Sequence, residues 1–257
     1  MKRLFFLVFF LFVQSGFTQE LETKKEPVFQ PGEELKYRLR YGFITAAEGT
    51  LKVEDSDIKF NERPVYHLIA HGRTSGSFDF FYKVRNRYDS YIDKEELIPY
   101  FYTENIKESN YRRNDKVRFY PNQQKVVSKK GTFKSKEQTF DLVSAYYFAR
   151  SLDLSDTHPG KIFTLTYYLN GDVSDLRFKY LGKEKVKTPM GYINCLKFSP
   201  EVQEGRIFRK DSKFYLWVTD DGNRIPVKAQ SEILVGSVIM ELTDYKGLKY
   251  PLNISKK

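Results

Sequence analysis

Cysteine and histidine are scarce in this sequence, which has one cysteine and three histidines among its 257 residues. The single cysteine, Cys195, excludes any internal disulfide. Structural zinc sites take four ligands, mostly from cysteine and histidine, so we predict no metal and no cofactor. Cys195 lies in GYINCLKF, where no neighbouring histidine could activate its thiol. We expect it to be a small apolar residue of the core.

Two of the histidines, His67 and His71, stand four residues apart in the stretch PVYHLIAH, which has the composition of a strand. Four residues of strand span about 13 Å at about 3.3 Å per residue. The two rings are therefore expected on one face of the strand, too far apart to share a metal ion. The third histidine, His158, stands alone before a proline.

Catalytic motifs are also missing. There is no nucleophile elbow, phosphate loop or dinucleotide fingerprint, and the closest stretch, HGRTSGSF, has Thr74 in place of the serine. Asp220 and Asp221 form an acidic pair in LWVTDDGNRIPVKAQ, and paired carboxylates are what glycoside hydrolysis requires. However, an aspartate followed by glycine is typical of a turn between two strands. We predict no catalytic residues and interpret the pair as the tip of a hairpin.

The sequence lacks an apolar run long enough to cross a membrane as a helix. Its main run, Leu4 to Val13, has about 10 residues, whereas a spanning helix needs about 20. The run follows two basic residues and precedes small ones, which is the pattern of a cleavable signal peptide over residues 1–18. We therefore predict export to the periplasm, including the periphery of the outer membrane, or to the extracellular space. No transmembrane segment is expected after cleavage.

Positive charge is in excess, since the net charge is +10 and remains +8 without the two cations of residues 1–18. In an intracellular protein this excess would suggest nucleic acid. An exported chain meets anionic lipid head groups and acidic glycans instead, so we predict no nucleic-acid partner. The cations are spread over many stretches, which is typical of a solvated face. The alternative is a basic face that docks onto an envelope partner, with candidates Arg112, Arg113, Lys129 and Lys130.

Strand-like alternation is abundant. In LKYRLRY (35–41), apolar and basic side chains alternate, as in a strand with one buried and one solvated face. Similar stretches separated by turn residues recur along the chain and predict a mainly β fold of antiparallel strands. Only TFDLVSAYYFARSLDLSD (139–156) has helical spacing, with Asp141 or Thr139 as its N-cap. We predict a single domain over residues 19–257, a curved antiparallel sheet or half-open barrel with one main helix packed against it.

Aromatic residues are the other excess, with 22 phenylalanines and 19 tyrosines. A large β core accounts for many of them. Tyrosines on otherwise polar faces also suit a groove that takes an amphiphilic ligand. The candidate ligand-lining residues are Phe81, Tyr102, Tyr147 and Trp217.

Several stretches occur in an order that resembles a known family. They are FQPGEELKYRLRYGFITAAEGTLKV, SGSFDFFYKVRNRYDSYID, LIPYFYTENIKESNY, FDLVSAYYFAR, GYINCLKFSPEVQEGRIF and LWVTDDGNRIPVKAQSEILVGSVIMEL. Over about residues 28–248 the chain is similar to the bacterial exported family catalogued as domain of unknown function 3108. The chain departs from the family's single Ala-Gly step at Ala46-Ala47-Glu48-Gly49, which implies a local change in a turn. The resemblance implies a β-rich exported protein, similar in fold to the curved half-barrel of periplasmic lipoprotein carriers, and brings no catalytic residues.

Three hypotheses of function are compatible with these features. In the first, a non-enzymatic exported protein binds an amphiphilic ligand, a lipid or lipoprotein-like acyl chain, in its curved sheet. In the second, a cell-envelope assembly factor docks through its basic face onto an envelope protein or acidic polymer. In the third, which has the least support, the chain is an envelope hydrolase. A large interior cavity lined by Phe and Tyr favours the first hypothesis, and a filled core favours the second.

Overall fold

The computed structural model describes residues 21–201, 213–232 and 236–255, and the predicted signal peptide lies outside these ranges. In the described residues the chain forms two α-helices, a short 3-10 helix and fifteen strands. The helices are α1 (Ser77–Phe81), α2 (Leu142–Ser151) and η1 (Pro121–Gln123). The strands are β1 (Glu34–Tyr41), β2 (Ile44–Phe60), β3 (Arg63–Thr74), β4 (Arg85–Asp93), β5 (Pro99–Glu108), β6 (Tyr111–Tyr120), β7 (Lys125–Ser128), β8 (Gly131–Lys134), β9 (Thr139–Phe140), β10 (Ile162–Leu169), β11 (Asp172–Thr188), β12 (Gly191–Pro200), β13 (Phe214–Thr219), β14 (Pro226–Glu232) and β15 (Ser237–Lys246).

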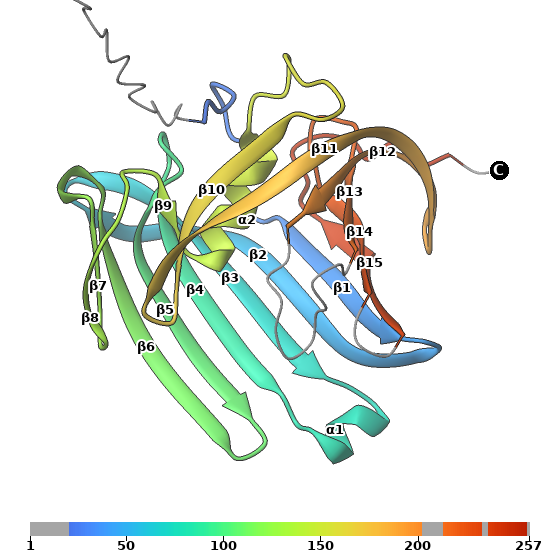
Figure 1. Ribbon diagram of the computed structural model, residues 1–257, viewed down its shortest axis with the longest axis horizontal. Coiled ribbons are helices and arrows are strands. Elements are labelled where there is room, and N and C mark those ends of the chain that lie inside the picture. Colours follow the sequence, from blue (N-terminus) through green and yellow to red (C-terminus); the bar gives the residue numbers. More distant parts are fainter. Residues whose placement is uncertain (1–20, 202–212, 233–235, 256–257) are drawn as a thin grey trace, which may run out of the picture.

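All fifteen strands belong to one sheet, in the order β8-β7-β6-β5-β4-β3-β2-β1-β15-β14-β13-β12-β11-β10-β9. Every neighbouring pair is antiparallel except β9 and β10, which run parallel. The sheet curves strongly, and α2 lies on its concave side (Figure 1). The predicted fold, a curved antiparallel sheet with one main helix packed against it, is confirmed.

The two ends of the sheet approach each other without forming a backbone ladder. The Tyr168 hydroxyl on β10 donates to Ser128 Oγ on β7 over 2.7 Å. Lys130 Nζ, in the turn between β7 and β8, donates to the carbonyl of Asn170 over 2.8 Å. Because side chains rather than paired strands bridge this gap, the architecture is an incompletely closed barrel.

The alternation at residues 35–41 places apolar and charged side chains on opposite faces of β1. Leu35 and Tyr37 are buried, and the Tyr37 hydroxyl lies 3.0 Å from that of Tyr146 on α2. Lys36 and Arg40 lie on the outer face. Fully burying a side chain of this size contributes about 1.5–3 kcal/mol, so the alternation itself decides which face of the strand meets the helix.

The departure from the family pattern at Ala46-Ala47 lies within β2 rather than in a turn. Leu39 on β1 pairs with Ala47, but the next residue, Arg40, pairs with Thr45. Ala46 is therefore the extra residue of a β-bulge, which bends a strand locally.

Helix α2 begins where the sequence indicates and ends earlier than predicted. Asp141 is the N-cap, and its side chain accepts hydrogen bonds from the backbone N–H groups of Val143 and Ser144 over 2.8 and 2.9 Å. The helix ends at Ser151 rather than at residue 156. The Ser151 carbonyl accepts a hydrogen bond from the N–H of Lys24, and Leu152 forms a β-bridge with Thr23. The N-terminal segment therefore competes for the backbone groups that would have continued the helix.

The short helix α1 is not predicted by the sequence, where FDFFY is a run of aromatic residues interrupted by Asp79. Side-chain hydrogen bonds close this connection between β3 and β4. Asp79 accepts from Thr74 Oγ1 over 2.8 Å and from both terminal nitrogens of Arg85 over 2.6 and 2.9 Å. These bonds hold the pKa of Asp79 at about 2, below its usual value.

The space between α2 and the strands is filled by aromatic side chains. Tyr147 and Phe148 of α2 are fully buried in the larger of two hydrophobic clusters. The rings of Phe29 and Tyr147 meet edge to face with centroids 4.8 Å apart, and Phe140 and Phe148 are 4.4 Å apart. Pairs at these distances add to the burial energy, so α2 is packed as a core element.

Cys195 is fully buried on β12, as predicted for a core residue. Burial raises the pKa of its thiol to about 12. The thiol therefore stays protonated at neutral pH, and the thiolate is the species that reacts with maleimides. We expect no modification of the native protein by N-ethylmaleimide at pH 7.5 and complete modification in denaturant, measured by mass spectrometry. Rapid labelling of the folded chain would contradict this placement.

Candidate functional site

The four candidate ligand-lining aromatics do not meet at one site. Tyr102 on β5 and Tyr147 on α2 are buried in the same hydrophobic cluster. Phe81 is exposed at the end of α1, and Trp217 belongs to the second cluster. The structure thus brings together two of the four, inside a packed core.

Trp217 lies on the outer face of the sheet. Its cross-strand neighbours are Lys197 on β12 and Lys228 on β14. Their ammonium groups lie 5.1 and 4.9 Å from the indole centroid, within the range of cation–π attraction. The tryptophan is nevertheless buried in the second hydrophobic cluster, beneath these two lysines, and does not line any of the clefts described below.

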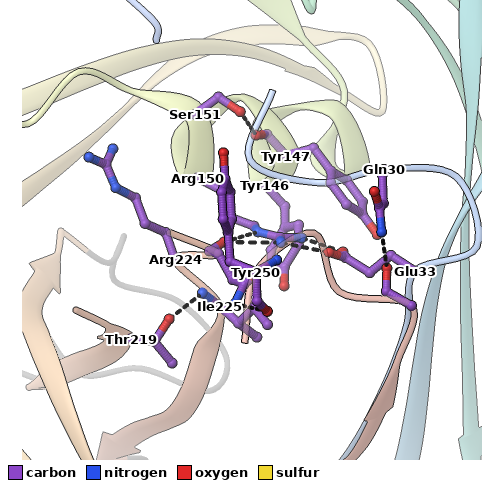
Figure 2. Close-up of polar contacts among 12 residues, drawn as sticks. Gln30, Glu33, Tyr146, Tyr147, Arg150, Ser151, Thr219, Arg224, Ile225 and Tyr250 are labelled. Carbon is purple, nitrogen blue, oxygen red and sulfur yellow. Dashed lines mark hydrogen bonds and ion pairs between the residues drawn. The ribbon is translucent and has the colours of Figure 1, made fainter. Parts of the chain in front are cut away.

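A buried charged cluster anchors α2 from below (Figure 2). The guanidinium of Arg150 donates to the two carboxylate oxygens of Glu33 over 2.6 and 2.9 Å and to the carbonyl of Asn223. Burial alone would lower the pKa of Arg150, but the carboxylate of Glu33 outweighs it and holds the pKa above its usual value. This cluster ties the helix, the segment before β1 and the β13–β14 turn into one unit. Its role is structural, because its donors are directed at protein groups.

The acidic pair at residues 220 and 221 lies at the reversal between β13 and β14. Asp221 Oδ1 accepts from Thr219 Oγ1 over 2.7 Å and from the N–H of Asn223 over 2.9 Å, whereas Asp220 pairs with Lys183 over 2.7 Å. A Cβ on Gly222 would lie 2.6 Å from the ring of Tyr250, so this position requires glycine. The prediction of a hairpin tip is confirmed, and the two carboxylates have separate partners.

The histidines of β3 share a face of the strand, as expected. His67 Nε2 lies 2.8 Å from Asp89 Oδ1, and its ring stacks on Tyr91. His71 lies in an outer cleft, described below. Within the described ranges, no three His, Cys, Asp or Glu side chains are grouped so that they could hold a metal ion.

Three open clefts differ in the charge of their walls. The first, of about 730 Å³, is lined by six cations and one carboxylate: Lys36, Arg38, Arg73, Arg85, Arg87, Lys107 and Glu48. The second, of about 610 Å³, has three cations and three carboxylates: Lys24, Lys183, Arg224, Asp153, Asp220 and Asp221. The third, of about 850 Å³, has three cations and five carboxylates: Lys136, Lys161, Arg177, Glu22, Glu137, Asp153, Asp156 and Asp175. Of these three, the first is the one that can attract an anionic partner, and we call it the basic cleft.

The register of β1 to β5 builds the basic cleft from two rows across the outer face. One row pairs Lys36 with Thr50, then His71, Arg87 and Asn105; the other pairs Arg38 with Glu48, then Arg73 and Arg85. Directly opposed residues of antiparallel strands point to the same side. Each strand therefore contributes one or two polar side chains to a continuous surface.

Most cations of the basic cleft are positioned by a carboxylate at its margin. Lys36 pairs with Asp244 over 2.8 Å, Arg73 with Glu48 over 2.7 Å and Arg87 with Asp89 over 2.7 Å. These three cationic side chains are 50%, 65% and 47% exposed, so they keep donors free for a partner. The ion pairs thus hold the hydrogen-bond donors of the cleft in place and neutralise part of its positive charge.

The four cations proposed from the sequence as a basic face are not gathered in this way. Arg113 on β6 points to the inner side, where its Nε lies 2.7 Å from Glu104. Lys129 and Lys130 donate to the backbone carbonyls of Asn114 and Asn170. Arg112 is exposed on β6 and donates to the carbonyl of Ser109. The basic face lies instead over β1 to β5. The cations of this basic face can be found in the sequence. The register between strands, which brings them together, cannot.

The fold and its clefts define a β-barrel-like protein whose single sheet is left open along one side. The comparison with known families agrees with this description. Residues 36–243 match the model of the protein family of unknown function DUF3108, and the chain belongs to this family.

A solved structure with a TM-score above 0.5 extends the likeness at the level of fold. A β-barrel-like protein of domain of unknown function DUF1849 from Brucella abortus has a TM-score of 0.54 and 9% identity, with 89% of this chain and 100% of that chain covered. A protein with a YmcC-like fold from Bacteroides fragilis has a TM-score of 0.40 and 12% identity, with 87% and 99% covered. Among curated proteins, none matches this chain in sequence. Over the described residues, no helix is long and apolar enough to span a membrane.

Proposed function

We propose that this chain is a non-enzymatic exported protein that docks through its basic cleft onto an acidic partner of the cell envelope. The observation that carries the proposal is the charge of the cleft walls. Six cations face one carboxylate in the basic cleft, whereas acids equal or outnumber cations in the other two clefts. Excess positive charge in a concave surface concentrates anionic partners and speeds their association.

The packing inside the sheet supports docking rather than the enclosure of an amphiphile. Tyr147 and Phe148 occupy the concave side, and both are fully buried against strand side chains. None of the three clefts is walled mainly by aromatic residues. A ligand pocket is normally concave and mostly apolar, whereas several charged side chains line each of these clefts.

The chemistry of the cleft suits carboxylate or phosphate groups. Four of its six cations are arginines, whose planar guanidinium groups bind such anions through two parallel hydrogen bonds. His71 and Asn105 lie on either side of Arg87 in the same row and supply further hydrogen-bonding groups. Repeated acidic groups on a polymer or a protein surface would meet several donors at once.

Neutralising three exposed cations of the cleft tests the proposal. We expect the triple variant Lys36→Gln, Arg73→Gln, Lys107→Gln to bind fluorescent poly-L-glutamate about tenfold more weakly than wild type, since three exposed charge contacts of about 0.5 kcal/mol each sum to about one decade. Fluorescence anisotropy at low salt gives the affinities. Binding of the wild type should weaken as salt rises and screens the charges.

A matched control removes the same charge elsewhere. Lys136, Lys161 and Arg177 line the third cleft and are paired with surface carboxylates, as cleft cations are. The variant with glutamine at these three positions should bind the polymer within about twofold of wild type. Equal losses in both triple variants would show that net charge alone governs binding, and the cleft would then lose its assigned role.

A further inference from the structure

The connections between strands lie along two opposite edges of the sheet, each formed by strand ends. The side chains of the connections differ between these two edges. In a run of antiparallel strands, alternate connections fall on the same edge. The β1–β2 turn, the β3–β4 connection with α1 and the β5–β6 turn therefore share one edge, at the lower side of the view (Figure 1). The β2–β3, β4–β5 and β6–β7 connections share the opposite edge.

The first edge carries aromatic side chains that are almost fully exposed. Phe43, Phe80 and Phe81 expose 102%, 88% and 80% of their surface. Ile44, Tyr82 and Tyr111, on the same three connections or beside them, are exposed as well. We call these six residues the aromatic edge. The opposite edge turns through polar residues, at Asn61-Glu62, Lys94-Glu95-Glu96 and Asn122-Gln123-Gln124. Exposure of large apolar groups at one edge marks an interaction surface.

Hydrogen bonds of Asp79 fix helix α1 so that Phe80 and Phe81 point outward. Asp79, between Phe78 and Phe80, turns back to the sheet and accepts hydrogen bonds from Thr74 and Arg85. The Thr74 hydroxyl in turn accepts from the N–H of Val84 over 2.9 Å. The connection is thus tied to both strands that it joins, while Phe80 and Phe81 stay outside the packed core.

The basic cleft begins directly behind the aromatic edge. Arg73 and Arg85 lie at the ends of β3 and β4 that meet α1, and Lys107 lies two residues before the β5–β6 turn. A belt of cations therefore borders the protruding aromatic side chains on the outer face. Apolar side chains at the tip and cations one layer behind match the depth profile of a bilayer surface, with its hydrocarbon interior and anionic head groups.

We propose that the aromatic edge inserts into the surface of an anionic lipid bilayer, with Phe43, Phe80 and Phe81 below the head groups and the basic cleft facing them. A bilayer fits better than a protein partner because the exposed apolar side chains stand on three separate connections and line none of the three clefts. Tyrosines such as Tyr82 and Tyr111 suit the interface, where the ring is in lipid and the hydroxyl in water. The proposal rests on the exposed edge and does not require that the cleft bind an acidic polymer.

Vesicle flotation with the exported, purified protein tests this proposal. We expect binding to phosphatidylcholine vesicles that contain phosphatidylglycerol and weaker binding to phosphatidylcholine alone. Replacing Phe43, Phe80 and Phe81 by serine should lower the partition coefficient by at least about tenfold, since three large apolar groups no longer leave water. A Phe43→Trp variant should show a blue shift of its added emission when vesicles are present.

The control triple replaces exposed apolar residues that lie away from the aromatic edge. Serine at Ile58, Ile162 and Leu169, which are also exposed, should leave the partition coefficient within about twofold of wild type. The triple variant of the basic cleft, with glutamine at Lys36, Arg73 and Lys107, should lose the preference for anionic vesicles but still bind both vesicle types weakly. Failure of the polymer assay with intact vesicle binding would reject only the acidic-polymer function.

Two outcomes would overturn the proposal. One is a wild-type protein that stays unbound in both vesicle types while circular dichroism shows that it is folded. The other combines two results: the wild type does not bind vesicles, and the variant with serine at Phe43, Phe80 and Phe81 loses a protein partner that cross-links to the wild type. The aromatic edge would then be a protein interface instead.

Discussion

Replacing Glu33 by alanine should lower the free energy of unfolding by about 3–5 kcal/mol, because it leaves the guanidinium of Arg150 buried without its counter-charge. The side chains of this pair are 0% and 2% exposed, and two hydrogen bonds join them. Guanidinium chloride unfolding, followed by far-ultraviolet circular dichroism, measures the change.

Two further variants test whether the buried pair contributes more to stability than an ordinary surface ion pair. Glu95 pairs with Arg63 at the surface and is 82% exposed, so Glu95→Ala should cost less than about 1 kcal/mol. The double variant Glu33→Leu, Arg150→Met removes both charges together and should recover much of the loss. A Glu33→Ala protein as stable as wild type would show that the cluster does not anchor α2.

Truncating Phe148 on α2 should destabilise the fold by a similar amount, about 3–5 kcal/mol, because Phe→Ala in a packed core loses burial and leaves a cavity. The ring is fully buried and lies 4.4 Å from that of Phe140. The same denaturant titration gives the value.

The matched control on the same helix is Leu142→Ala. Leu142 is an exposed residue of the first turn, so its truncation should change stability by less than about 1 kcal/mol. A small effect at Phe148 would mean that the concave side has spare volume. That result would restore the binding of an amphiphile inside the sheet as the better hypothesis.

Local signals in the sequence predicted much of the fold because they act over a few residues. Alternation in 35–41 decides which face of β1 is buried, since every second side chain points to the core. Asp141 caps α2 because its carboxylate accepts two N–H groups that the first turn leaves free. Asp221 turns the chain between β13 and β14 for a similar local reason, because its carboxylate accepts the N–H of Asn223.

The candidate site was harder to predict because its residues meet only through pairing between strands. Among the four candidate aromatics, Tyr102 and Tyr147 are buried in the larger cluster, Trp217 is buried in the second cluster and Phe81 is exposed. Composition identifies such residues as apolar. It does not say whether the sheet encloses them or presents them, because that depends on curvature and on the position of α2.

The sequence by itself determined the mainly β class, the start of the main helix, the hairpin at Asp221 and the burial of Cys195. These depend on periods and turn residues that are read within one segment. Only the tertiary structure decided the two charged rows of the basic cleft, the aromatic edge and the burial of Arg150 against Glu33. The physical reason is that register and strand order place distant residues in contact, such as Glu33 and Arg150, which are 117 positions apart, and these are properties of the whole sheet.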